Sequence, residues 1–167
     1  DDSARDSADP IAESSPWEAP EYSGEACPSL EDGYNSGFDS ADKDRDMLLV
    51  LPDEPEGAPV LFAWHWLGGS ASEIVGWVGY DDLARDEGVI IVAPESDGND
   101  YEWRSWERPR NNPDLIFFDD LVSCLHAQFD VDLSRIYATG MRAGGLWTSY
   151  LMTWRSIVLA ASAPLSG

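Results

Sequence analysis

The sequence predicts an α/β fold in which helices flank a mostly parallel sheet. The continuous apolar runs Val60–Trp64 and Val89–Ala93 are typical of strands that are buried on both faces. Segments with helical periodicity alternate with such strands through short connections, which favours right-handed crossovers between parallel strands. The chain has 167 residues, of which 43% are hydrophobic, so it can build one core and fits one domain.

The first half of this pattern contains three strands and one helix. Met47–Leu51 is a short apolar run followed by Pro52, which interrupts a strand. The second strand is the buried run Val60–Trp64. We expect a helix over 72–87, because Gly88 supplies the usual helix stop directly before the third strand.

The second half contains two helices and two strands. We expect a helix over 114–129, a strand over 135–139, a helix over 143–154 and a strand over 157–163. The first of these helices has an apolar stripe at helical spacing that should face a core. Its members are Leu115, Phe118, Val122, Leu125 and Phe129.

In such sheets, ligands bind beyond the carboxyl ends of the strands, so the loops beginning at His65, Pro94 and Gly140 are the expected functional site. The last of these loops has the strongest local signal. A strand at Ile136–Thr139 leads into Gly-Met-Arg-Ala-Gly-Gly and then into a helix. Glycines two residues before and two after a central residue are typical of a nucleophile elbow. The central residue should be Ser but is Arg142, whose guanidinium stays protonated and cannot act as a nucleophile.

The charge balance excludes several classes of partner. The chain carries 32 Asp or Glu and 10 Lys or Arg, a formal charge of −22. We therefore expect no nucleic-acid partner, because phosphate binding depends on cationic side chains. No apolar run is long enough to span a bilayer, so we expect no membrane insertion.

We expect no cofactor and no bound metal. Asp42, Asp44 and Asp46 alternate as in a calcium loop, but Met47 occupies the position of the required Gly, which favours a solvated turn. The glycines of 140–145 fit neither a phosphate loop nor a dinucleotide fingerprint.

Residues 1–30 are predicted to form an acidic, Pro- and Ser-rich tether, and residues 31–167 the folded domain. Trp17 and Tyr22 are candidates to dock the tether onto the domain. Cys27 and Cys124 leave two alternatives open, a single disulfide or two buried thiols, with Cys124 on a helix. The polar leader and the acidic composition favour a secreted or extracytoplasmic protein whose signal sequence is absent from this chain.

Besides the predicted elbow, the sequence contains several other motifs that occur in the same order in one protein family. The segments are 64–71, 92–95, 131–141 and 161–167, with Trp103 and Trp106 between them. From about residue 45 to the end, the chain resembles the N-terminal half of a secreted α/β-hydrolase of the polyhydroxybutyrate depolymerase and feruloyl esterase type. Segment 64–71 resembles the family's His-Gly oxyanion loop, although Trp66 stands where Gly is commoner.

The resemblance implies a serine esterase that acts on an ester or a polyester. Arg142 would hold the nucleophile position, and the oxyanion would be held by backbone N–H groups of Ala143 and of Leu67 or Trp66. The substrate-binding tryptophans would be Trp64, Trp66, Trp103 and Trp106.

The triad acid and His would lie beyond Gly167, because both histidines of the chain, His65 and His126, precede the elbow. The domain would therefore be incomplete at the C-terminus, a further segment would be its partner, and this chain alone would be inactive. His65 is expected to be a structural hydrogen-bonding residue and His126 a helix-surface residue.

Alternatives remain at this point. Trp103 and Trp106 could serve core or lid packing instead of binding. The chain could also be a catalytically silent binding domain in which Arg142 clamps a carboxylate. A third alternative is a structural fragment whose exposed sheet edge needs a partner chain.

Overall fold

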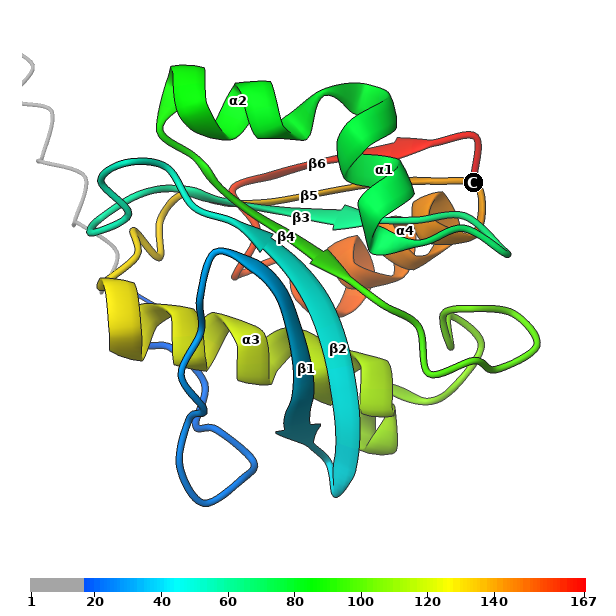
Figure 1. The fold of residues 1–167 in the computed structure, drawn as a ribbon. Coiled ribbons are helices and arrows are strands. Elements are labelled where there is room, and N and C mark those ends of the chain that lie inside the picture. The colour runs from blue at the N-terminus through cyan, green and yellow to red at the C-terminus, as the bar shows by residue number, and fades with distance from the viewer. Residues whose placement is uncertain (1–16) are drawn as a thin grey trace, which may run out of the picture.

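The computed structural model describes residues 17–167, so the first sixteen residues of the predicted tether lie outside the described residues. A six-stranded sheet with the order β1-β2-β4-β3-β5-β6 forms the centre of the fold (Figure 1). Strands β3 to β6 are mutually parallel, while β1 and β2 are antiparallel to their neighbours. The predicted mostly parallel α/β sheet is confirmed. The strands are β1 (Gly33–Ser40), β2 (Lys43–Val50), β3 (Val60–Trp64), β4 (Ile90–Pro94), β5 (Ile136–Met141) and β6 (Ala161–Leu165).

Helices cover both faces of this sheet. Helices α1 and α2 lie on one face and helices α3 and α4 on the other. Among residues 17–167, no helix is long and apolar enough to cross a membrane. The helices are α1 (Ala71–Val78), α2 (Tyr80–Glu87), the short 3₁₀ helix η1 (Pro109–Asn111), α3 (Pro113–Phe129) and α4 (Ala143–Trp154).

Alternation along the central strands divides the core into two layers. Phe62 and Trp64 of β3 pack towards α3 and α4, whereas Ala63 between them packs towards α1 and α2. The layer under α3 and α4 contains the large aromatic side chains, and Phe62 stacks on Trp64 at a centroid distance of 6.0 Å. Burial of both faces explains the uninterrupted apolar runs of β3 and β4.

Four elements differ from the sequence prediction. Strand β2 begins at Lys43 instead of Met47, because its polar first half pairs with β1. The helix expected over 72–87 is two helices, because Gly79 adopts a left-handed conformation with φ 77° and ends α1 where α2 begins. Strand β1 was missed because its sequence is polar and it pairs only at the edge of the sheet. Strand β6 begins at Ala161 instead of 157, because Val158 and Leu159 first donate hydrogen bonds to the carbonyl of Arg155.

The described part of the leader, residues 17–30, lies against α3. Ser23 donates hydrogen bonds from its N–H and its hydroxyl to the Asp120 carboxylate at 2.8 and 2.7 Å. Cys27 forms a disulfide with Cys124 of α3, which confirms the first of the two alternatives for the cysteines. Because the bridge closes a loop of 97 residues, it stabilises the fold by about 4 to 5 kcal/mol in the chain-entropy account.

Candidate active site

A strained turn connects β5 to α4. Arg142, between the last residue of β5 and the first of α4, has φ 55° and ψ −113°. A positive φ is unfavourable for a side chain as large as Arg, and such a conformation costs on the order of 1 to 3 kcal/mol. The Arg142 N–H donates to the Leu165 carbonyl at 2.8 Å, which attaches the turn to the end of β6. The chain therefore bends sharply at this residue.

Glycines on both sides allow this bend. A Cβ atom at Gly140 would lie 2.3 Å from the Gly144 carbonyl oxygen, and a Cβ at Gly144 would lie 1.9 Å from the Trp64 carbonyl oxygen. Both distances are shorter than any normal contact and involve backbone atoms that cannot move aside. Close packing of the first turn of α4 against the ends of β5 and β3 therefore requires glycine at these positions.

The loop that follows β3 is fixed at several points. Trp103 donates a hydrogen bond from Nε1 to the His65 carbonyl at 2.9 Å, and the Gly68 N–H donates to Glu102 Oε1 at 2.6 Å. Ser70 caps α1 by accepting a hydrogen bond from the Glu73 N–H. The loop is thus held by the segment that follows β4 as well as by its own helix.

His65 is buried beneath this loop, with 1% of its surface exposed. Its Nδ1 lies 2.9 Å from the Trp66 carbonyl oxygen, and its Nε2 lies 3.4 Å from Glu95 Oε2. Burial lowers the pKa of His65, but the Glu95 carboxylate, the Trp66 carbonyl and the charge of Glu102 outweigh it and raise the pKa above 6.5. The His65 side chain therefore connects the loop after β3, through the Trp66 carbonyl, to the segment after β4, through Glu95.

The aromatic segment 95–112 after β4 is held by charged side chains. Arg45 of β2 and Asp114 of α3 form an ion pair at 3.0 Å with side-chain exposures of 1% and 0%. Asp114 also accepts a hydrogen bond from the Arg104 N–H at 2.9 Å and lies 3.3 Å from the Arg104 guanidinium. The Arg45 guanidinium sits 4.2 Å from the centre of the Phe117 ring. The predicted sequence motifs gave no indication of this network.

Arg104 extends the network to Asp97. Burial raises the pKa of Asp97, but hydrogen bonds from Arg104, Asn99 and Lys43 more than offset this and hold the pKa well below its ordinary value. The Asp97 carboxylate is therefore charged throughout the physiological range. Segment 95–112 contains one short 3₁₀ helix and turns closed by backbone hydrogen bonds, and these ion pairs attach it to β2 and α3.

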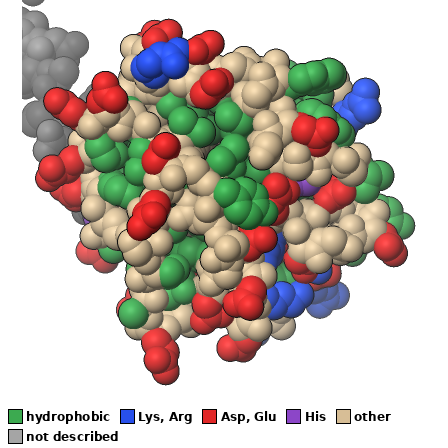
Figure 2. Space-filling view, viewed as in Figure 1, with side chains coloured by type: hydrophobic (Ala, Val, Ile, Leu, Met, Phe, Trp, Pro, Cys, Tyr) green, Lys and Arg blue, Asp and Glu red, His purple; other side chains and the backbone are tan. Residues whose placement is uncertain are grey.

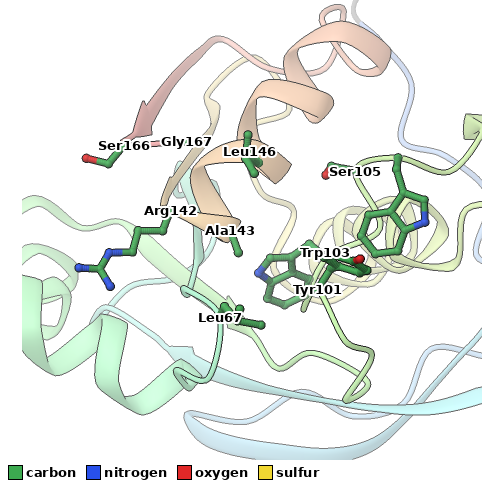
Figure 3. A pocket seen from close by; sticks show the side chains of 10 residues that line it. Leu67, Tyr101, Trp103, Ser105, Arg142, Ala143, Leu146, Ser166 and Gly167 are labelled. Atoms are coloured by element: carbon green, nitrogen blue, oxygen red, sulfur yellow. The ribbon is translucent and has the colours of Figure 1, made fainter.

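The turn, the loop after β3 and segment 95–112 enclose a cavity of about 640 Å³ (Figure 3). Its walls combine apolar and aromatic residues, including Ala143 and Leu146 from the first turn of α4. The Arg142 guanidinium extends away from Trp103 and Tyr101. The cavity is lined by Leu67, Tyr101, Trp103, Ser105, Trp106, Arg142, Ala143, Leu146, Ser166 and Gly167.

The structure separates the four tryptophans that were predicted to bind substrate. Trp103 and Trp106 line the cavity, although Trp103 is 1% exposed and Trp106 is 55% exposed. Trp64 is fully buried in the core and does not reach the cavity. Trp66 also lies outside the cavity lining and contacts Trp77 of α1 instead.

Among the predicted oxyanion residues, Leu67 lines the cavity from the loop after β3 and Ala143 from the first turn of α4, while Trp66 does not line it. The intrahelical bonds of α4 begin with the Leu146 N–H donating to the Arg142 carbonyl. The N–H of Ala143 precedes that bond and has no intrahelical acceptor.

His126 lies on α3, with Nδ1 3.2 Å from the Val131 carbonyl oxygen.

Sequence reasoning missed part of the cavity wall. Tyr101 and Ser105 lie in the same aromatic loop as the predicted tryptophans, and their position there is the signal that could have found them. Leu146 follows the elbow by one helical turn and could have been found from helix periodicity. Ser166 and Gly167 follow β6 and reach the cavity only through pairing of β6 with β5.

No protein-family model matches the chain. It is 29% identical over 132 residues to a probable feruloyl esterase C of Aspergillus terreus, an alignment that covers 74% of this chain and 46% of that protein. It is 27% identical over 121 residues to a poly(3-hydroxyalkanoate) depolymerase C of Paucimonas lemoignei, covering 68% of this chain and 28% of that protein. The chain spans about half the length or less of the curated relatives that it matches.

Solved structures share the fold. The native sOPH crystal structure superposes with a TM-score of 0.71 at 22% identity, covering 83% of this chain and 53% of that one. An acetyl xylan esterase from Aspergillus awamori superposes with a TM-score of 0.58 at 16% identity, covering 71% of this chain and 45% of that one. The chain has the α/β-hydrolase fold and is similar in sequence to feruloyl esterases and a polyester depolymerase, which confirms the predicted resemblance.

Proposed function

We propose that residues 31–167 form the N-terminal part of the catalytic domain of a carboxylic ester hydrolase of the feruloyl esterase and polyester depolymerase type. The observation that carries this proposal is the strained turn at Arg142 beside an aromatic cavity. The similarity to feruloyl esterases and a depolymerase supports the same reaction class.

Within this proposal, the turn is the nucleophile elbow, and Arg142 occupies the position of the nucleophile. A residue with φ 55° between a parallel strand and a helix presents its side chain above the carboxyl edge of the sheet. A Ser there would attack the ester carbonyl carbon, and a His from a further segment would accept the hydroxyl proton and later protonate the leaving alcohol. With Arg at 142 this attack has no nucleophile, so this chain alone is expected to be inactive.

The oxyanion would be held by the N–H groups of Leu67 and Ala143. Leu67 lines the cavity from the loop after β3 and Ala143 from the start of α4, and the N–H of Ala143 lies at the positive end of the α4 dipole. The aromatic wall of Tyr101, Trp103 and Trp106 would contact the acyl or alcohol portion of the ester.

The alternative of a carboxylate-clamping binding domain has less support. A clamp would need the Arg142 guanidinium to face a ligand held against the aromatic wall. Instead it extends away from Trp103 and Tyr101. The similar curated proteins are esterases, which also favours hydrolysis over binding alone.

A further segment of the domain is proposed to pack against β6. This strand lies at the edge of the sheet and is largely exposed. Leu165 of β6 and Ile157 before it are 48% and 78% exposed. A parallel strand and its helix would cover these apolar side chains. The Cys27–Cys124 disulfide supports a secreted or extracytoplasmic location, because disulfides persist in oxidising compartments.

The test uses the chain extended at its C-terminus until the domain is as long as that of its relatives. The measurement is the rate at which this extended chain hydrolyses a soluble p-nitrophenyl ester. We expect the Arg142→Ser form to hydrolyse the ester and the Arg form to be silent. Arg142→Ala is the matched control, since it removes the guanidinium without adding a hydroxyl. Equal rates for the Ser and Ala forms would contradict the proposed role of position 142.

A further inference from the structure

The Trp66 carbonyl, in the loop after β3, is contacted by two nitrogen atoms. The Gly69 N–H donates to its oxygen at 2.8 Å and closes a four-residue turn, in which Gly68 has φ 73°. His65 Nδ1 lies 2.9 Å from the same oxygen. A carbonyl oxygen only accepts hydrogen bonds, so His65 holds this carbonyl when Nδ1 carries a proton.

The Trp66 carbonyl and the Leu67 N–H belong to one peptide unit. A trans peptide is planar, and its C=O and N–H point in opposite directions, so a rotation that releases the carbonyl turns the N–H by the same angle. Among residues 17–167 every peptide bond is trans. The Leu67 side chain lines the cavity and is 59% exposed, so its packing restrains this peptide unit only weakly. The direction of the Leu67 N–H therefore depends on what holds the Trp66 carbonyl.

The His65 ring is itself held in place. Its Nε2 lies 3.4 Å from Glu95 Oε2, and the other oxygen of that carboxylate accepts a hydrogen bond from the Ala71 N–H at 3.0 Å. Trp103 donates to the His65 carbonyl at 2.9 Å, and its ring lies 5.0 Å from the imidazole. The ring therefore keeps one nitrogen towards the Trp66 carbonyl and the other towards Glu95.

Each ring nitrogen of His65 thus faces a group that only accepts hydrogen bonds. A neutral imidazole carries one N–H and can satisfy one of these groups, whereas the protonated ring donates to both. In the neutral ring we expect the proton on Nε2, because the Glu95 carboxylate is charged and is the stronger acceptor. Nδ1 then presents a lone pair to the Trp66 carbonyl oxygen. Loss of the second proton therefore releases the carbonyl that sets the direction of the Leu67 N–H.

The surrounding charge favours the protonated ring. Burial lowers the pKa of His65, but Glu95, the Trp66 carbonyl and the charge of Glu102 outweigh it, so the pKa lies above 6.5. The formal charge of −22 acts in the same direction. Figure 2 shows acidic side chains spread over one face of the molecule, with basic ones at only a few places. Two nearby carboxylates and the charge of the whole chain thus support protonation.

We propose that His65 is a positioning residue whose protonated ring holds the Trp66 carbonyl and thereby directs the Leu67 N–H into the cavity. His65 does not line the cavity itself and acts through the peptide unit of Trp66 and Leu67. The inference rests on the proposed function in one respect, namely that the Leu67 N–H holds the oxyanion. It adds that this oxyanion site is formed while His65 is protonated and is weakened when the ring loses its proton.

The kinetic test compares two substitutions of His65 in the extended Arg142→Ser chain. Asn places an amide nitrogen close to the position of Nδ1 and can still donate to the Trp66 carbonyl, whereas Gln places its amide near the position of Nε2. We expect His65→Gln to lower kcat at least about tenfold with KM changed less than about twofold, because losing a whole oxyanion donor costs about 100- to 1,000-fold and misdirecting one costs less. His65→Asn should retain most of the parent kcat.

His126→Gln is the matched control. Its Nδ1 also lies near a backbone carbonyl oxygen, that of Val131 at 3.2 Å, but His126 is on α3 and does not line the cavity. This substitution should leave kcat unchanged.

The pH profile separates this role from a purely structural one. A triad His from the further segment titrates in the parent and in the His65→Asn form alike, so the ratio of their kcat values isolates His65. We expect the ratio of parent to variant to fall as the pH rises through the pKa of His65, above 6.5. Glu95→Gln removes the carboxylate that favours the protonated ring and should move this fall to lower pH. A ratio that does not change with pH would contradict the proposal.

A second measurement needs neither catalysis nor a substitution. In the 167-residue chain labelled with nitrogen-15, the amide resonance of Leu67 should shift with pH at the same midpoint as the His65 ring. A Leu67 amide that stays constant while His65 titrates would overturn the proposal, as would equal losses of kcat for His65→Asn and His65→Gln. If the extended Arg142→Ser chain hydrolyses nothing while the Leu67 amide follows His65, the proposed function fails and the positioning of the Leu67 N–H stands.

Discussion

Two regions wall the same cavity but are held in place by different means. The turn at 140–145 is fixed by backbone fit, with carbonyl oxygens of the turn and of β3 so close that Cβ atoms at Gly140 and Gly144 would clash with them. Segment 95–112 is fixed by charged side chains, through Asp97, Arg104 and Asp114. A region fixed by backbone fit tolerates almost no added atom, whereas one fixed by buried ion pairs is sensitive to the loss of a single charge.

The turn can be broken by a single methyl group. In Gly144→Ala the new Cβ would lie 1.9 Å from the Trp64 carbonyl oxygen, so β3 and α4 must separate. We expect the free energy of unfolding to fall by more than about 4 kcal/mol, which is in the range that marks severe disruption of a core. Urea unfolding followed by circular dichroism measures it.

Gly76→Ala is the matched control for this prediction. Gly76 lies inside α1 with nothing within 4 Å of an added Cβ. The substitution should stabilise the protein by about 0.5 to 1 kcal/mol, because Ala is the better helix former. A Gly144→Ala protein with unchanged stability would show that the turn is not held by backbone contact.

The ion-pair network can be broken by removing one charge. Asp114→Asn leaves Arg45, whose side chain is 1% exposed, without its partner carboxylate, and loss of one member of a buried pair costs about 3 to 5 kcal/mol. We also expect faster amide hydrogen exchange in 95–112, measured by mass spectrometry, than in β3 and β5. If amide hydrogen exchange became faster by the same factor over the whole chain, Asp114 would not act locally on segment 95–112.

Asp82→Asn is the control for charge alone. Asp82 pairs with Arg85 on the surface of α2, where both side chains are more than 60% exposed. Its loss should change the free energy of unfolding by less than about 0.5 kcal/mol.

The contrast between the two regions also explains what the sequence could predict. The turn is encoded within six consecutive residues, so the spacing of Gly140, Arg142 and Gly144 was sufficient to locate it. The network joins Arg45 to Asp114 across 69 positions of the chain, and no local pattern links them. The same limit applies to Trp64 and Trp66, which are two residues apart, although Trp64 is fully buried in the core and Trp66 is half-buried against Trp77 of α1. The family resemblance suggested aromatic binding residues without distinguishing those two environments.

Each region contains one non-glycine residue with a positive φ, and this allows a smaller test. Arg142→Gly relieves a φ of 55°, and we expect it to stabilise the protein by about 1 kcal/mol. Glu102→Gly relieves a φ of 65° but removes the carboxylate that accepts the Gly68 N–H at 2.6 Å. We expect these two effects to offset each other, so that the free energy of unfolding changes by less than about 1 kcal/mol. A larger gain from Glu102→Gly than from Arg142→Gly in thermal unfolding would contradict this account.

The last expected effect depends on pH and arises at His65, whose Nε2 faces Glu95 at the start of segment 95–112. A raised pKa means that the folded state binds the proton more tightly than the unfolded state, in which the ordinary value is 6.5. The resulting stabilisation is fully present below that ordinary value and is lost as the pH rises through the folded-state pKa. Each unit of pKa difference corresponds to about 1.4 kcal/mol.

The measurement is the difference in unfolding free energy between the parent and His65→Gln, at about pH 5.5 and about pH 8.5. The parent should exceed the variant by more at the lower pH, because only there does the charged imidazole face Glu95 at 3.4 Å. A difference that grows with pH would mean that burial dominates at His65 and that Glu95 does not link the two loops through it.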